Sequence, residues 1–169
     1  MDEIVNRVAK SSLITLDLEE HYPSGARTKI DIAPWLYEGI ILKETDFRKS
    51  LEEHDWSQYQ NHYIALYCSE DAIIPSWAYL LVSTKLAPYV HKVVVGDLNL
   101  LETLIFSDVI ANIDVKEFEG RPVIVKGCAK ITIPESAFTE LILKIQPVAK
   151  SLMYGEACST VPLYKKSKK

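Results

Sequence analysis

The chain has 169 residues, of which 48% are hydrophobic and 25% are charged, and its formal net charge is −4. This composition is typical of a soluble globular domain, and the acidic charge argues against sequence-independent binding of nucleic acid. No apolar run approaches the ~18 residues that span a bilayer, so no membrane association is expected. The opening residues, MDEIVNRVAK, lack the apolar core of a signal peptide, and we therefore expect a cytoplasmic protein.

The first 60 residues predict a hairpin followed by a helix. Apolar and polar residues alternate in LITLDLEEHY (13–22) and again in ARTKIDI (26–32), and the turn signal YPSG lies between these segments. A period of two is typical of half-buried strands, so the pair predicts an antiparallel hairpin. The segment ETDFRKSLEEH (44–54) predicts a helix with acidic residues in its first turn.

Residues 61–162 alternate between strand and helix patterns. Strands are predicted at 62–67, 93–98, 121–127 and 152–157, and helices at 75–86, 99–113 and 134–145. Strands separated by such helices pair in parallel through right-handed crossovers. We therefore predict an α/β fold with an open, mainly parallel sheet, in a single domain over 1–169 that ends in a basic flexible tail at 163–169.

Two strand–helix–strand segments within this region repeat each other at a shift of 59 residues. The matched pairs are Pro75 and Pro134, Ala78 and Ala137, Tyr79 and Phe138, Lys85 and Lys144, Leu86 and Ile145, and Pro88 and Pro147. The pair Gly96-Asp97 also matches Gly155-Glu156. This pattern favours a structural duplication, although proline commonly opens and ends helices in any such unit.

The three cysteines each directly follow a predicted strand. They are Cys68, Cys128 and Cys158. If the first strands of the two repeats lie side by side, the strand order reverses between the strands that precede Cys68 and Cys128. Ligands of open parallel sheets bind at the carboxyl ends of strands flanking such a reversal. Because neighbouring strands lie ~4.8 Å apart, we expect the thiols to approach one another there.

Three thiolates at one edge of a sheet could hold a zinc ion or an iron–sulfur cluster. The candidates for a fourth ligand are Asp17, Asp71, Asp97 and Glu156, whereas His62 should lie at the opposite end of its strand. Trp77, early in a helix beside the expected crevice, and Asp71, one of these ligand candidates, are candidates to contact the bound cofactor. The leading hypothesis is therefore a metal- or cluster-binding protein.

Two alternatives remain open. A metal-free thiol enzyme or sulfur acceptor would use a cysteine whose pKa is lowered at a helix N-terminus. A non-catalytic interaction module would bury its cysteines as inert thiols and bind partners through its acidic surface or the hairpin edge, which could also pair two copies into a homo-oligomer. The fingerprints GxGxxG, GxxxxGK[ST] and GxSxG are absent, which gives no support to a nucleotide site or a serine hydrolase.

Several long phrases of the sequence resemble an uncharacterised bacterial family, domain of unknown function 2480. They are VAKSSLITLDLEE, GIILKETDFR, HDWSQYQ, DAIIPSWAY and PVAKSLMYGEACSTVPLYK, and the resemblance covers nearly the whole chain. It implies no assigned activity and no established catalytic residues. It does imply an association with iron–sulfur assembly proteins as partners, in keeping with a role in iron–sulfur or sulfur metabolism.

Overall fold

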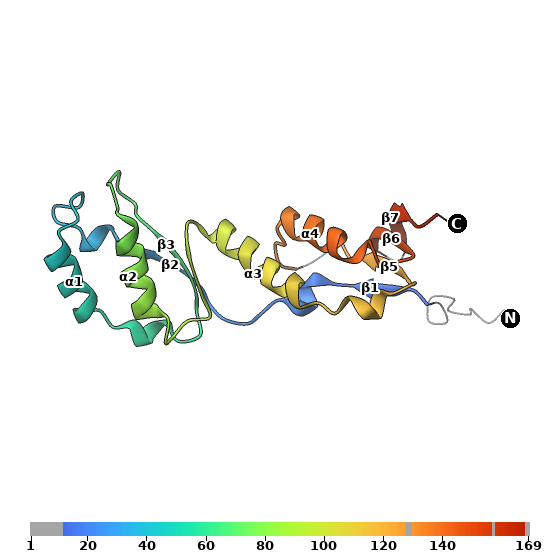
Figure 1. Cartoon of the computed structure of the whole chain (residues 1–169), viewed down its shortest axis with the longest axis horizontal. Helices are drawn as coiled ribbons and strands as arrows, with labels where there is room; N and C mark the ends of the chain where they lie inside the picture. Colours follow the sequence, from blue (N-terminus) through green and yellow to red (C-terminus); the bar gives the residue numbers. More distant parts are fainter. Residues whose placement is uncertain (1–11, 128–129, 157, 168–169) are drawn as a thin grey trace. The chain divides into compact units, whose positions relative to one another are not determined.

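The structure is a computed structural model that describes residues 12–127, 130–156 and 158–167, and Figure 1 shows its elements in chain order. The chain divides into two compact units. Unit 2 is Pro23–Leu104, and unit 1 combines the residues up to Tyr22 with those from Ile105 onward. Unit 2 is therefore inserted, in sequence, into unit 1. No helix within the described residues is long and apolar enough to cross a membrane.

Unit 2 is a three-stranded parallel sheet with two α-helices. Its elements are β2 (Arg27–Asp31), the 3-10 helix η2 (Ala33–Trp35), α1 (Glu44–Glu53), the 3-10 helix η3 (Trp56–Tyr59), β3 (Tyr63–Tyr67), α2 (Ser76–Leu86) and β4 (Lys92–Val95). The strand order is β2-β3-β4, and both neighbouring pairs are parallel. A helix joins each strand to the next, as parallel pairing requires.

The core of unit 2 lies between the sheet and these helices. Ile64 and Leu66 of β3 are fully buried, and they belong to one hydrophobic cluster with Phe47 of α1 and Val82 of α2. Side chains two residues apart on a strand point to the same face. Both helices therefore cover the same face of the sheet (Figure 1).

Unit 1 has the same kind of sheet, extended by one strand. Its elements are β1 (Ile14–Leu16), the 3-10 helix η1 (Leu18–His21), α3 (Leu98–Asn112, within which the unit boundary falls), the 3-10 helix η4 (Val115–Phe118), β5 (Pro122–Val125), α4 (Glu135–Ile145), β6 (Ser151–Glu156) and β7 (Ser159–Lys165). The order is β1-β5-β6-β7, in which only β6 and β7 are antiparallel. Val123 and Val125 are fully buried in one cluster with Phe106 of α3 and Leu141 of α4.

The two units repeat the same order of elements, and the sheet order β1-β5-β6 corresponds to β2-β3-β4. Equivalent buried residues lie 59 positions apart in the sequence. They are Phe47 and Phe106, Leu51 and Ile110, Ile64 and Val123, Leu66 and Val125, Ala78 and Ala137, Val82 and Leu141, and Leu86 and Ile145. The repeat thus extends back from the segments found in the sequence to include α1 and α3.

The first strands of the two units also match, although their spacing is shorter. Leu16 and Ile30 lie opposite equivalent residues of the middle strands. Asp17 and Asp31 follow them, and each accepts a hydrogen bond from the backbone N–H two residues further on, at 2.9 and 3.0 Å. The spacing differs from 59 because unit 2 begins at Pro23, after β1 and η1 of unit 1 and before the other elements of that unit.

The predicted α/β class, with mainly parallel strands and two strand–helix–strand repeats, is confirmed. The pairing of the N-terminal strands differs from the expectation: β1 pairs in parallel with β5, and β2 pairs in parallel with β3. The repeats also form two sheets instead of one, so β3 and β5 are not neighbours. Alternation of period two identifies a strand, but it does not identify the strand's partner or direction.

The strand β7 is absent from the sequence-based prediction, which ends the last strand at residue 157. In the structure, β7 continues to Lys165 and pairs with β6 from Ser159 to Lys165, with one shift of register that leaves Leu163 without a partner residue in β6. Pro162 obscures this strand in the sequence, because proline cannot donate to a ladder of hydrogen bonds. At the edge of a sheet one side of the strand has no partner strand, so proline is tolerated there.

Candidate ligand-binding site

The cysteines do not form the predicted site. Cys68 does follow β3, and Cys158 lies in the turn between β6 and β7, but they belong to different units with separate sheets. Cys128 lies outside the described residues. The described residues contain no group of three His, Cys, Asp or Glu side chains that could hold a metal ion. The predicted metal or cluster site is therefore wrong, because it assumed one sheet with β3 beside β5.

The carboxyl edge of the unit 1 sheet carries an ion pair among carboxylates. Lys126, directly after β5, donates from Nζ to Oδ2 of the buried Asp17 at 2.5 Å. This hydrogen bond raises the pKa of Lys126; burial opposes the shift, and the charges of Asp17, Glu156 and Glu19 add to it. Glu156 Oε1 is buried and has no hydrogen-bonding partner among the described residues. Three carboxylates thus surround a single ammonium group, so this edge is poorly suited to anions.

The carboxyl edge of unit 2 brings an aspartate, a thiol and a phenol together. Burial alone would raise the pKa of Asp31, but hydrogen bonds from Ser69 and Ala33 lower it. Burial raises the pKa of Tyr79, and the charges of Cys68 and Asp31 raise it further. The Tyr79 phenol therefore stays protonated across physiological pH, next to an ionised carboxylate.

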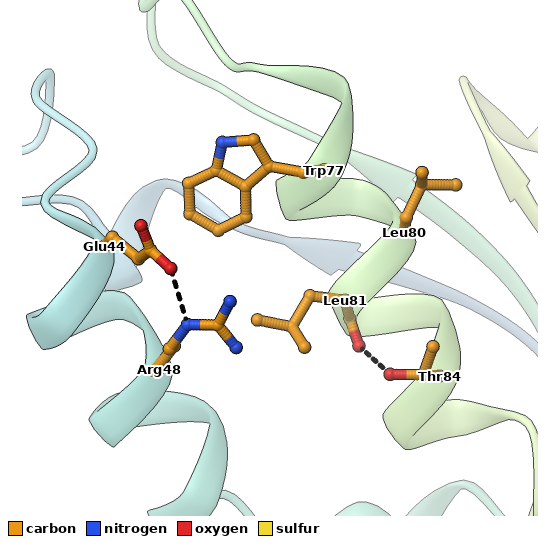
Figure 2. Close-up of a pocket in the computed structure, with 6 residues that line it drawn as sticks. All are labelled: Glu44, Arg48, Trp77, Leu80, Leu81 and Thr84. Carbon is orange, nitrogen blue, oxygen red and sulfur yellow. Dashed lines mark hydrogen bonds and ion pairs between the residues drawn. The ribbon is translucent and has the colours of Figure 1, made fainter.

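A groove between α1 and α2 of unit 2 is the clearest candidate for a ligand site. Its volume is about 350 Å³, and its lining residues are Glu44, Arg48, Trp77, Leu80, Leu81 and Thr84. Figure 2 shows Trp77 and Leu81 projecting from α2, and the Arg48 guanidinium extending toward them from α1. Protein sites for small molecules combine such apolar surface with a few placed polar groups.

Of the two side chains that define this α1–α2 groove, Trp77 packs against the core of unit 2 and Arg48 pairs with a carboxylate at the surface. Trp77 meets the fully buried Phe47 edge to face, with ring centroids 5.9 Å apart. Arg48 Nε donates to Glu44 Oε1 at 2.9 Å, one helical turn away. The guanidinium carbon lies 5.9 Å from the centre of the Trp77 ring. The Nη atoms of Arg48 have no hydrogen-bonding partner among the described residues, so they are available to a ligand.

The two predicted cofactor contacts line different hollows. Trp77 lines the α1–α2 groove, whereas Asp71 lines a hollow of about 440 Å³ with Ile40, Ile41 and Ile73 among its other walls. The prediction identified Trp77 as an aromatic residue early in a helix. It did not identify Arg48, although Glu44 and Arg48 stand four residues apart on a predicted helix, the spacing at which such side chains meet.

These observations define an α/β protein of two structurally similar units, one inserted in sequence into the other, with an aromatic and cationic groove in the inserted unit. The chain belongs to the family described as protein of unknown function DUF2480, whose model matches residues 2–166. Family membership, inferred above from phrases of the sequence, is thus confirmed. No significant match was found among curated proteins or among solved structures. The expected partnership with iron–sulfur assembly proteins stays a prediction.

Proposed function

We propose that the protein binds a small aromatic carboxylate in the α1–α2 groove of unit 2. The observation that supports this proposal is the joint lining of one groove by the indole of Trp77 and the guanidinium of Arg48. The groove's volume of about 350 Å³ suits a ligand of one or two rings.

The guanidinium supplies the charged contact of this proposal. Glu44 accepts a hydrogen bond from Nε of Arg48. The edge formed by the two Nη atoms is left to a ligand, and two parallel N–H groups match the geometry of a carboxylate. A lysine ammonium would supply the charge without this paired geometry.

The opposite wall supplies the apolar contact. Leu80 is 65% exposed, and Trp77 and Leu81 are half-buried, so all three side chains present apolar surface to the groove. An aromatic ring placed against the indole gains area burial and ring stacking, which together contribute about 1–3 kcal/mol. Affinities in the micromolar to millimolar range are expected for such an open groove.

A binding titration of the full chain tests this proposal, with 2-naphthoate as the probe and 2-naphthamide as its uncharged counterpart. We expect naphthoate to shift the Trp77 indole N–H signal in NMR spectra and to bind at least 10-fold more tightly than the amide. Arg48→Gln should weaken naphthoate binding by about 10-fold or more, and Arg48→Lys by less.

Lys49→Gln provides the matched control, because Lys49 is the next residue of α1 and its side chain is 75% exposed outside the groove. It removes the same charge without touching the groove. Equal loss of affinity in Arg48→Gln and Lys49→Gln would refute the site and indicate general electrostatic attraction. No difference between acid and amide would refute the role of Arg48.

We also propose that the protein works in the cytoplasm. The support is that Cys68 and Cys158 are both free thiols, which is the usual state in a reducing compartment. Fractionation of cells that produce the full chain tests this location. Recovery in a secreted or surface fraction would refute it.

A further inference from the structure

Unit 1 contains a second groove, beside α4, which the proposed function leaves unexplained. Its volume is about 510 Å³, and its lining residues are Val125, Glu135, Phe138, Thr139, Ile142, Leu143, Tyr154 and Leu163. All of them come from α4 and from β5, β6 and β7 of the same unit. We refer to it as the α4 groove.

The α4 groove exists because the unit 1 sheet is wider than its layer of helices. Two helices cover three strands in unit 2, and unit 1 adds β7 as a fourth strand beside β6. The added strand leaves apolar side chains in solvent: Leu163 of β7 is 50% exposed, and Leu143 on the adjoining side of α4 is 74% exposed. Exposed leucines that line one groove are typical of a contact surface.

The floor of the α4 groove is rigid. The Tyr154 ring meets the Phe138 ring edge to face, with centroids 5.5 Å apart. The same tyrosine ring lies against the backbone of Gly127, where an added Cβ would come within 2.8 Å of its Cζ atom. Both rings are therefore held before any partner arrives, which lowers the entropic cost of binding.

The charge of the α4 groove is negative. Glu135, in the first turn of α4, is exposed and is the only ionisable carboxylate or amine among the lining residues. Lys144, further along α4, cannot neutralise it, because its Nζ donates to the carbonyl oxygens of Ile110 and Ala111 at 2.6 Å. A complementary partner would present apolar side chains with a basic group at one end.

We propose that the α4 groove binds an amphipathic α-helix of a partner protein, with a basic residue of that helix facing Glu135. Such a helix would pack beside α4 at the usual interaxial distance of ~8–10 Å and would lie over β6 and β7. It would complete the layer of helices that unit 1 lacks above its fourth strand. Recognition then follows the helix-in-groove mode, in which apolar residues at i, i+3, i+4 and i+7 contact the groove.

Addition of a partner strand to the open edge of β7 is a less suitable mode. Pro162 lies in the middle of β7 and has no N–H to donate. Edge prolines of this kind discourage pairing with a further strand. The exposed leucines, in contrast, lie on the face that a helix would cover.

The test uses the full chain and two synthetic helical peptides of about 14 residues, which span roughly 20 Å. One peptide combines leucine with lysine, and the other has the same leucine pattern with glutamate. We expect the leucine–lysine peptide to bind, with NMR shifts confined to α4, β6 and β7, and to bind at least 10-fold more tightly than the leucine–glutamate peptide. Glu135→Lys should reverse this preference.

Matched variants locate the contact. Leu143→Asp and Leu163→Asp should each weaken binding of the leucine–lysine peptide by about 10-fold or more. Both residues are exposed, so these changes should leave the fold intact. Ile73→Asp is the control, because Ile73 is 94% exposed and lies in unit 2, outside both grooves.

Three results would overturn the proposal. Equal effects of Leu143→Asp and Ile73→Asp would show that the peptide does not use the α4 groove. Equal affinity for both peptides would remove the role of Glu135. A dimer in sedimentation that dissociates in Leu143→Asp would show that a second copy of this chain occupies the groove.

Discussion

Asn61 and Gly120 have nearly the same left-handed backbone conformation, with φ angles of 62° and 66°, and they lie 59 positions apart. Each follows a 3-10 helix and precedes the middle strand of its unit. Their equivalence shows that the two units share a specific turn in addition to the same packing of helices on a sheet. Asparagine and glycine are the residues that adopt this conformation most readily.

Gly120 should therefore tolerate asparagine better than alanine. No atom lies within 4 Å of the position that a Cβ would occupy, so the cost of substitution comes from the backbone conformation alone. We expect Gly120→Ala to lower the free energy of unfolding by about 1–2 kcal/mol, and Gly120→Asn to lower it by less. Urea denaturation of the two variants measures the difference, and equal stability would contradict the equivalence of the two turns.

The equivalent phenylalanines provide a second prediction. Phe47 and Phe106 are both fully buried, each in the core of its own unit. We expect Phe47→Ala and Phe106→Ala each to cost about 3–5 kcal/mol, whereas Thr45→Ala, at an exposed position of α1, should cost less than about 0.5 kcal/mol. Hydrogen exchange of the β3 and β5 amides reports each unit separately. A small effect at either phenylalanine would refute its place in the core.

The sequence predicts the class of fold because strands, helices and the 59-residue repeat each leave a local pattern. It did not reveal two sheets, since nothing local says which strand pairs with which. One signal was available: Asp17-Leu18 and Asp31-Ile32 are similar pairs, an aspartate before an apolar residue, at the carboxyl ends of the first strands of the two units. Two similar first strands indicate two sheets, whereas the turn signal between them suggested a hairpin.

The site was predicted less well than the fold for a related reason. Placement of Cys68 and Cys158 after strands was correct, but their proximity depended on the assumed strand order. Trp77 was identified from its position early in a helix. The other wall of its groove was missed, because the sequence does not show that α1 lies beside α2. The α4 groove depends on β7, and the sequence-based prediction missed this strand because Pro162 lies in the middle of it.

Removal of Lys126 alone should destabilise unit 1 more than removal of both charges of its ion pair with Asp17. Lys126→Met leaves the buried Asp17 carboxylate without its cation, whereas the double variant with Asp17→Asn also removes that charge and keeps the Oδ1 acceptor for Glu19. We expect the single variant to unfold at a lower denaturant concentration than the double variant. The same midpoint for both would show that Asp17 bears no unfavourable charge when Lys126 is absent.

The pH dependence of this ion pair has a definite sign. Asp17 raises the pKa of Lys126 above the ordinary value of 10.5, so the native state holds this proton more tightly than the unfolded state. The stabilisation is fully present below 10.5 and is lost as pH rises through the higher native value. The difference between the wild type and Lys126→Met should therefore stay constant from pH 6 to 9, and a change across that range would contradict the assignment.

His54 should give unit 2 the opposite response, within the physiological range. Burial lowers its pKa from 6.5, and the charge of Asp55 offsets only part of this shift. Its ring packs against Trp56 and Tyr59, at centroid distances of 4.6 and 5.7 Å. The unfolded state therefore binds the proton more readily than the native state, and stability is lost as pH falls below about 6.5.

The slope of stability against pH isolates this effect from the loss of ring packing. We expect the free energy of unfolding of the wild type to decrease between pH 7.5 and pH 5.5, and His54→Gln to decrease less over the same interval although it is less stable throughout. An NMR titration of the wild type should place the pKa of His54 below 6.5. Parallel slopes together with a pKa at or above 6.5 would show that the ring is not desolvated in the native state, and that its contacts with the two aromatic residues do not exclude water.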